Sequence, residues 1–414
     1  MPDPSALLPE TDAQIAALGG ADIALGIAAP DRMEGGPPVL EAARAALRER
    51  FPGARSVVLY AYPATLAAEA PALDGATPVL PLPWRAERRG ADADAGLPVE
   101  ATALILAAGQ RLRATGCALL GSEVASLTPD WIGRLLAPVI EEGQDLVAPY
   151  YVRHPYSGAV TTGLLYPLVR AVYGRQLRYP MGSELACSLR LMDRVVDQAK
   201  ASGRRAVELR LLVEAIAGGM PICQAALGPR PVPAEGPGLS TVLATALSLA
   251  FDEVERSAPL WQRIRGSQPV PVMGTLPPQS LEPVPLDASR MLDAFRLGQQ
   301  SLSEVWGAAL PPSTMVELKK LARQPDQSFR FPDRLWSRIV YDFCLAYHTR
   351  VMSRDHLMGA LAPLYLGWFG AWYMEMGDVQ VPALESRLEQ LCLVFEAEKP
   401  YLISRWRWPD RFNP

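Results

Sequence analysis

The sequence is poor in the residues that build metal-binding or disulfide-bonded scaffolds. Only three histidines occur in 414 residues, and the five cysteines lie far apart, mostly in apolar surroundings. The cysteines are Cys117, Cys187, Cys223, Cys344 and Cys392. Because no two of them form a close pair, neither a zinc site nor a disulfide framework is indicated, and buried thiols in a reducing cytosol fit better.

Long apolar runs and an excess of positive charge are also missing. No stretch reaches the roughly 18 apolar residues of a membrane span, and the first residues lack the basic and apolar segments of a signal peptide. The net charge of −4 gives no reason to expect nucleic acid as a partner. We therefore expect a soluble cytoplasmic protein.

Apolar residues are abundant enough for a large core. They make up 49% of the chain, against 20% charged residues, and 414 residues suffice for two domains. We expect a mobile leader over 1–20, an α/β domain over 21–265, a Pro-rich linker over 266–288 that is neither helix nor strand, and a helical domain over 289–414.

The α/β prediction depends on alternating strand-like and helix-like segments. Strands are expected over 21–28, 56–62, 79–83 and 117–120, an amphipathic helix over 39–51 and a long alanine-rich helix over 97–116. A further helix begins after Thr128, which suits the N-cap, and Pro129, which suits the first helical position. This alternation predicts a mostly parallel sheet flanked by helices. The C-terminal helices are expected over 291–310, 314–321, 334–350, 354–377 and 382–406.

Longer motifs occur in one order from Ala21 to Trp408. They include Ser126-Leu127-Thr128-Pro129-Asp130-Trp131-Ile132, Val147-Ala148-Pro149-Tyr150-Tyr151, Phe331-Pro332-Asp333-Arg334-Leu335-Trp336 and Pro363-Leu364-Tyr365-Leu366-Gly367. In these motifs the chain resembles the bacterial GT-A glycosyltransferases related to mannosylglycerate and glucosylglycerate synthases. The resemblance implies a GT-A (Rossmann-like) fold, a nucleotide-sugar donor and a small acceptor.

The resemblance also implies a metal site that this chain has altered. In the family an Asp-x-Asp triplet and a later His hold a divalent cation, which neutralises the departing diphosphate. Here the triplet is Gly121-Ser122-Glu123, and Val232 stands where the His is expected. Glu123 is the one carboxylate of the triplet that can ligate a metal, so we expect no tight site, or weak Mg²⁺ or Mn²⁺ binding if the protein is active.

Three further donor-side positions depart from the family pattern. Asp31 follows a first strand that lacks the usual polar ending, and Tyr62 stands roughly where an Asp would hold the base and ribose. Glu100 replaces a Lys beside the phosphates, so that a carboxylate repels the diphosphate there. Alternatively, Glu100 merely begins a helix, where a carboxylate is favourable at the N-terminus.

The acceptor side keeps more of the pattern. Glu184, in Gly182-Ser183-Glu184, and Glu208 match carboxylates that the family uses in catalysis. The alternatives are a cap-region charge for Glu184 and a surface ion pair with nearby arginines for Glu208. The polar residues that match an acceptor-binding loop are Tyr150, Arg153, His154, Tyr156, Thr161 and Thr162.

These losses leave two hypotheses. The favoured one is a pseudo-glycosyltransferase, a binding or scaffolding module that forms homo-oligomers or pairs with an active relative. The other is active hexosyl transfer from a nucleotide sugar to a small hydroxy-acid-like acceptor. A metal-independent variant of the second would use the nearby cations Arg85, Arg88 and Arg89.

Overall fold

The computed structural model describes residues 7–29, 36–65, 77–84, 97–121, 127–202, 207–230, 239–276, 286–377 and 379–408. The chain divides into two compact units. The first contains Met1–Arg153, Leu177–Pro237 and Pro269–Gln279, and the second contains His154–Gln176, Gly238–Gln268 and Ser280–Pro414. The two units interleave along the chain, which the consecutive ranges proposed from the sequence did not anticipate.

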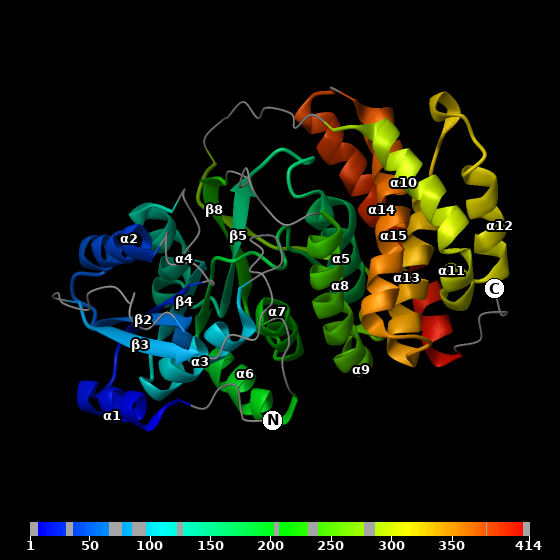
Figure 1. Ribbon diagram of the computed structural model, residues 1–414. Coiled ribbons are helices and arrows are strands. Elements are labelled where there is room, and N and C mark those ends of the chain that lie inside the picture. Colours follow the sequence, from blue (N-terminus) through cyan, green and yellow to red (C-terminus); the bar gives the residue numbers. More distant parts are fainter. Residues whose placement is uncertain are drawn as a thin grey trace. The chain divides into compact units, whose positions relative to one another are not determined.

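The first unit is built on an eight-stranded sheet with the order β10-β8-β5-β7-β4-β1-β2-β3 (Figure 1). Among the described strands of this sheet, β7 runs antiparallel to its neighbours β4 and β5, and the other pairings are parallel. The predicted mostly parallel α/β fold is therefore confirmed. The strands are β1 (Ile23–Ala28), β2 (Ser56–Pro63), β3 (Val79–Trp84), β4 (Gly116–Gly121), β5 (Leu146–Val152), β7 (Leu185–Ser188), β8 (Ile222–Pro229) and β10 (Val272–Met273).

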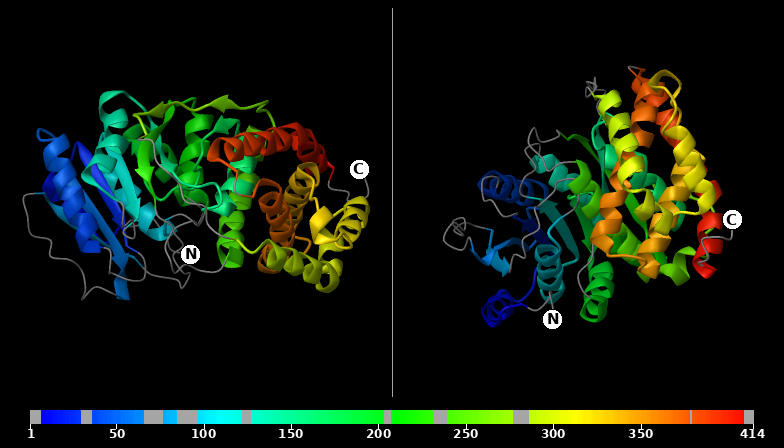
Figure 2. Two further views of the ribbon diagram at one scale, coloured as in Figure 1. Left: turned by 90° about the horizontal axis from the view of Figure 1, so that it is seen from above. Right: turned by 45° about the vertical axis from the view of Figure 1, so that its right-hand side comes forward.

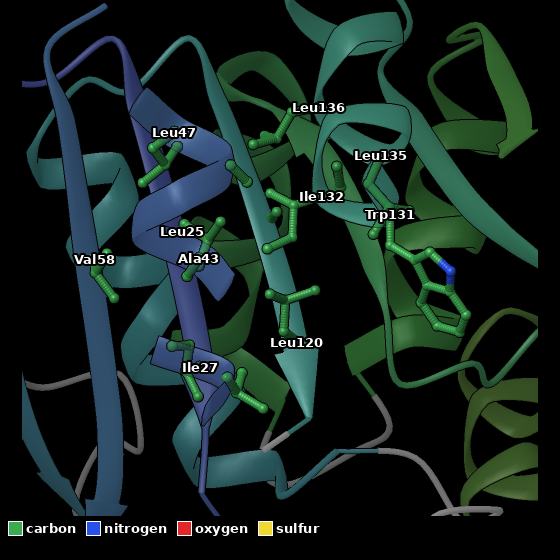
Figure 3. Packing of buried hydrophobic residues seen from close by; sticks show 14 of the residues in the cluster. Leu25, Ile27, Ala43, Leu47, Val58, Leu120, Trp131, Ile132, Leu135 and Leu136 are labelled. Carbon is green, nitrogen blue, oxygen red and sulfur yellow. The ribbon is translucent and has the colours of Figure 1, made fainter. Parts of the chain in front are cut away.

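Helices cover both faces of this sheet. On one face, α2 (Gly36–Arg50) and α4 (Pro129–Glu141) pack apolar side chains onto β1, β2 and β4, as Figure 3 shows for Leu47, Leu136 and Leu120. On the other face, α3 (Val99–Arg111) lies so close to β1 that a Cβ on Gly26 would be 2.2 Å from the Cγ2 of Ile105. The same unit contains α1 (Pro9–Leu18), α6 (Leu189–Ser202) and α7 (Val207–Ala217).

The start of α4 agrees with the sequence prediction. Thr128 has an extended backbone, and its side chain accepts a hydrogen bond from the backbone N–H of Trp131. Pro129 occupies the first turn, where its missing N–H costs nothing. The helix therefore begins at Pro129, and Trp131 in its first turn belongs to the buried cluster (Figure 3).

Several features of the fold were not predicted, among them the strands β5 and β8. Residues 9–18 of the supposed leader form α1, in which Thr11 and Ile15 are buried. The Pro-rich segment contains β9 (Gln268–Pro269) and β10, and β10 extends the sheet beside β8. Such a strand is possible because the carbonyl of Pro271 accepts from the N–H of Gln224, a bond that needs no proline N–H. The antiparallel strand β7 was also missed.

The second unit is mainly helical. Its C-terminal helices run side by side in both views of Figure 2, in yellow to red. The helical elements are η2 (Thr161–Leu165), α5 (Tyr166–Tyr173), α8 (Leu239–Arg256), α9 (Ala258–Trp261), α10 (Ala288–Ser301), α11 (Ser303–Ala309), α12 (Pro312–Leu321), η3 (Asp326–Ser328), α13 (Asp333–Thr349), α14 (Arg354–Met376) and α15 (Val381–Arg407). The predicted C-terminal helical region is thus confirmed, and α5 and α8 join it from earlier in the chain. No helix in the described ranges is long and apolar enough to cross a membrane.

Candidate functional site

The carboxyl ends of β4, β1 and β2 meet at one edge of the sheet. Their register pairs Ala28 with both Gly121 and Ala61, so Tyr62 lies one residue further along the same edge. This is where parallel α/β sheets place their ligands. The structure therefore brings the predicted donor positions Gly121 and Tyr62 to one edge. Three other predicted residues, Asp31, Ser122 and Glu123, lie outside the described residues.

The predicted donor residue Glu100 lies in the first turn of α3 and is partly exposed. That position agrees with the alternative in which its carboxylate favours the helix N-terminus. It agrees equally with a place beside a bound phosphate, because anions also bind at helix N-termini. The effect of Glu100 on a diphosphate therefore stays a prediction.

A buried hydrogen-bonded network centres on Glu184, whose side chain is 0% exposed. Its carboxylate accepts hydrogen bonds from the Tyr151 hydroxyl and from the Ser183 hydroxyl, the latter at 2.9 Å. The Arg230 guanidinium lies 3.5 Å from the same carboxylate and donates to Ser183 Oγ at 2.6 Å. Arg230 also lies 5.0 Å over the Tyr151 ring. One carboxylate is thus enclosed by two hydroxyls and one cation from its own chain.

The local folding of three strands assembles this network. Because β7 runs antiparallel, the residues just before it, Ser183 and Glu184, arrive at the edge where the parallel strands β5 and β8 end. Gly182 is needed there, since a Cβ would lie 2.3 Å from the Cγ of Pro149. Tyr151 is the next-to-last residue of β5, and Arg230 directly follows β8.

Electrostatics keep the Tyr151 hydroxyl protonated. Burial raises the pKa of Tyr151 well above its ordinary value, and the adjacent negative charge of Glu184 raises it further. The tyrosine ring is held between Trp131 and Tyr179, with ring centroids 5.9 and 4.7 Å away. Tyr151 therefore acts as a fixed hydrogen-bond donor to Glu184.

The second predicted catalytic carboxylate, Glu208, is also buried. It lies in the first turn of α7 and accepts a hydrogen bond of 2.6 Å from the backbone N–H of Leu97. Burial raises the pKa of Glu208 to about 7, the Leu97 bond opposes this, and the charge of Glu184 adds to it. The surface ion pair considered from the sequence is wrong, because the residue is 3% exposed.

The predicted acceptor loop is divided between the two units. Tyr150 and Arg153 belong to the first unit, where the Tyr150 ring meets Tyr179 edge-on at 6.4 Å. His154, Tyr156, Thr161 and Thr162 belong to the second unit. The prediction that these six residues bind one acceptor stays a prediction.

Within the second unit, His154 and Tyr156 are packed as core residues. Their rings lie 4.9 Å apart, and burial lowers the pKa of His154. The Tyr156 ring packs edge-on against Trp372 and Tyr373, and its hydroxyl donates to the Gly377 carbonyl at 2.9 Å. Thr161 and Thr162 begin η2, and the side chain of Thr162 is buried.

The described side chains do not fit a divalent cation. Across the described ranges, no three His, Cys, Asp or Glu residues come together as metal ligands. The Glu184 carboxylate already has a cation and two hydroxyl donors, and Glu208 has a backbone donor. Glu123, the predicted ligand, is outside the described residues.

Sequence reasoning missed the partners of Glu184. Tyr151 ends the motif Val147-Ala148-Pro149-Tyr150-Tyr151, and Arg230 lies two residues before Val232, where the resemblance implies a His. The available signal was a basic residue directly after a buried apolar strand.

Comparison with known proteins gives distant structural likeness. No protein-family model matches the chain, and no curated protein matches it. Among solved structures, a mycobacterial protein matches at 22% identity and a TM-score of 0.42, over 60% of this chain and 78% of its own. The glucosyl-3-phosphoglycerate synthase of Mycobacterium tuberculosis, crystallised with Mn²⁺, UDP and glucosyl-3-phosphoglycerate, matches at 19% identity and a TM-score of 0.41, over 60% and 84%. The same enzyme with phosphoglyceric acid matches at 19% identity and a TM-score of 0.40, over 60% and 84%.

Proposed function

We propose that this protein is a non-catalytic relative of the GT-A glycosyltransferases, which acts as a binding or scaffolding module. The observation that carries the proposal is the enclosure of Glu184. A catalytic carboxylate must reach a substrate or a metal, whereas this one is fully buried and paired with Arg230, Tyr151 and Ser183. Such a pair is costly to break, because the separated charges would be buried alone.

The donor side supports the same proposal. Gly121 supplies no carboxylate at the end of β4, and Tyr62 is a buried aromatic where the resemblance implies an Asp. Glu100 adds negative charge at the start of α3. A nucleotide diphosphate carries negative charge, which the Glu100 carboxylate would repel, and the nearby cations Arg85, Arg88 and Arg89 lie outside the described residues. On this proposal, the partner of the binding module is a second copy of the chain or an active relative.

Active hexosyl transfer is the second candidate, and Glu208 favours it. A carboxyl group with a pKa of about 7 can hold or release a proton near neutral pH, as a general acid or base must. On this alternative, Glu208 and Glu184 position a small hydroxy-acid-like acceptor, and Glu123 contributes to weak Mg²⁺ or Mn²⁺ binding. Glu208 must also become accessible to substrate, because its side chain is buried in this structure.

Calorimetry with UDP-glucose and GDP-mannose, each with and without Mn²⁺, separates the two candidates. The non-catalytic proposal expects no saturable binding at micromolar concentrations and no release of UDP or GDP on prolonged incubation with 3-phosphoglycerate or glycerate. Turnover that is lost in Glu184→Gln or Glu208→Gln would end the proposal.

Metal binding is tested separately by titration of Mn²⁺ into the unchanged protein and Glu123→Ala. Several oxygen ligands are needed for a stable site, so we expect no micromolar binding. Micromolar binding that disappears in Glu123→Ala would contradict this. Light scattering on the purified chain then tests whether it forms a homo-oligomer. A measured mass of one chain excludes the homo-oligomer, and pairing with another protein is then the remaining form of the proposal.

A further inference from the structure

A cavity of about 460 Å³ lies within the second unit, beside the last turns of α15. Its lining comes from residues 264–266, which follow α9, from one side of α15 between Glu396 and Ser404, and from Arg407 and Trp408 at the end of that helix. Its volume is in the range of small-molecule sites, roughly 300–1,000 Å³. It belongs to neither the sheet edge nor the predicted acceptor loop.

The charge around this cavity is positive. Three cations line it, Arg265, Lys399 and Arg407, against one carboxylate, Glu396. That carboxylate is already bonded, at 2.6 Å from the Nε of Arg170 and at 2.7 Å from the Ser267 hydroxyl. Arg170 also pairs with Glu389. When Arg170 and Glu389 are added to the count, four cations still face two carboxylates. A dianion therefore complements the cavity.

Lys399 is a buried donor with unused capacity. Its side chain is on the α15 face that meets α5, and its ammonium donates to the carbonyls of Val172 at 2.7 Å and Ile264 at 3.0 Å. An ammonium group has three N–H donors. Among the described residues, no acceptor binds the third N–H of Lys399. Lys399 lines the cavity, and it is 5% exposed.

The rim of the cavity offers an apolar surface beside these cations. Trp408 is 71% exposed, and Ile403 and Pro400 lie in the same lining. The end of α15 is held in place because the Trp406 ring stacks on His348 at 4.2 Å and meets Trp261 edge-on at 5.4 Å. An exposed indole next to fixed cations suits a ligand that is apolar at one end and anionic at the other.

We propose that this cavity binds a small organic phosphate monoester. The phosphate is held by Lys399, Arg265 and Arg407, and the apolar part packs on Ile403 and Trp408. A monoester suits the cavity because it carries close to two negative charges at neutral pH and three acceptor oxygens. This site is separate from the non-catalytic sheet edge, so each can fail without the other.

Calorimetry with phenyl phosphate and inorganic phosphate tests the proposal. We expect one site per chain and at least about tenfold tighter binding of phenyl phosphate, because inorganic phosphate has no apolar part. Arg407→Gln should weaken both probes about tenfold, as loss of a charged hydrogen bond does. Trp408→Ala should weaken phenyl phosphate and leave inorganic phosphate unchanged.

Arg263→Gln is the matched control, because Arg263 is an exposed arginine of the same loop that does not line the cavity. It should change affinity less than twofold. Both arginine changes lie on the surface, and circular dichroism verifies that each variant is folded. The proposal is overturned by absence of saturable binding up to about 10 mM. It is equally overturned if Arg263→Gln weakens binding as much as Arg407→Gln, since general charge attraction would then explain the result.

Discussion

Glu208→Gln should make the first unit more stable at alkaline pH. Burial raises the pKa of Glu208 to about 7 from an ordinary value of 4.5. Between these two pH values the folded chain keeps a proton that the unfolded chain has released. Stability therefore falls as pH rises through this window, and the loss is complete above pH 7.

The size of this loss follows from the two pKa values. Their difference corresponds to about 3 kcal/mol of unfolding free energy. Glutamine cannot ionise, and its side-chain oxygen can still accept the hydrogen bond from Leu97 N–H. We therefore expect Glu208→Gln to be close to the unchanged protein at pH 5 and about 3 kcal/mol more stable at pH 8.5.

The measurement must report the first unit alone, because burial also raises the pKa of Asp342 in the second unit to about 7. Urea unfolding followed by thiol labelling and mass spectrometry does so, since Cys117 and Cys187 lie in β4 and β7 and are buried. The labelling pulse is given at one common pH. Glu49→Gln, an exposed change on α2, serves as the control. If Glu208→Gln loses stability from pH 5 to pH 8.5 as steeply as the unchanged protein does, the reasoning is refuted.

Three further changes test other parts of the first unit. Gly26→Ala forces a methyl group against Ile105 and should cost about 1–3 kcal/mol in urea unfolding; an unchanged midpoint would show that α3 moves aside freely. Arg230→Met leaves the Glu184 charge buried without its cation and should cost about 3–5 kcal/mol. Adding Glu184→Gln should recover most of that loss, and a double variant no better than the single one would contradict the pairing. Glu100→Lys should tighten UDP binding measured by calorimetry, because at ~4 Å the exchange of charge is worth a few kcal/mol at intermediate dielectric. If the Glu100 carboxylate only stabilises the N-terminus of α3, UDP affinity stays unchanged and the unfolding free energy falls by less than ~1 kcal/mol.

Of the described strands of the eight-stranded sheet, local signals predicted β1 to β4 and missed the other four. The strand expected over 117–120 is β4 (Gly116–Gly121), and the helix expected over 354–377 is α14 (Arg354–Met376). The first is a short apolar run, and the second begins after the N-cap residue Ser353 and ends before the C-cap residue Gly377. The segment 291–310 was expected to be one helix and is two, α10 and α11, separated at Leu302. No glycine or proline marks that break.

Long-range pairing was beyond the sequence signals. The strand β7 has four residues, too few to show an alternation of apolar and polar side chains. Its antiparallel direction depends on where the neighbouring strands lie. The contacts within the candidate site could not be predicted from the sequence for the same reason. Glu184 was found by resemblance, but its partners Tyr151 and Arg230 come from other strands, 33 and 46 residues away along the chain. Only the folded sheet brings them together.

The interleaving of the two units has a consequence for biosynthesis. The chain passes from one unit to the other after Arg153, Gln176, Pro237, Gln268 and Gln279. During translation, α5 leaves the ribosome more than 200 residues before the helix α15 that buries it, and Lys399 meets Val172 across a separation of 227 residues. The segments 154–176 and 238–268 must therefore wait, with apolar surface uncovered, until the C-terminal helices of their own unit have been made. We expect such a nascent chain to depend on chaperones until its last helix has been made, and neither unit to be obtainable as a contiguous fragment.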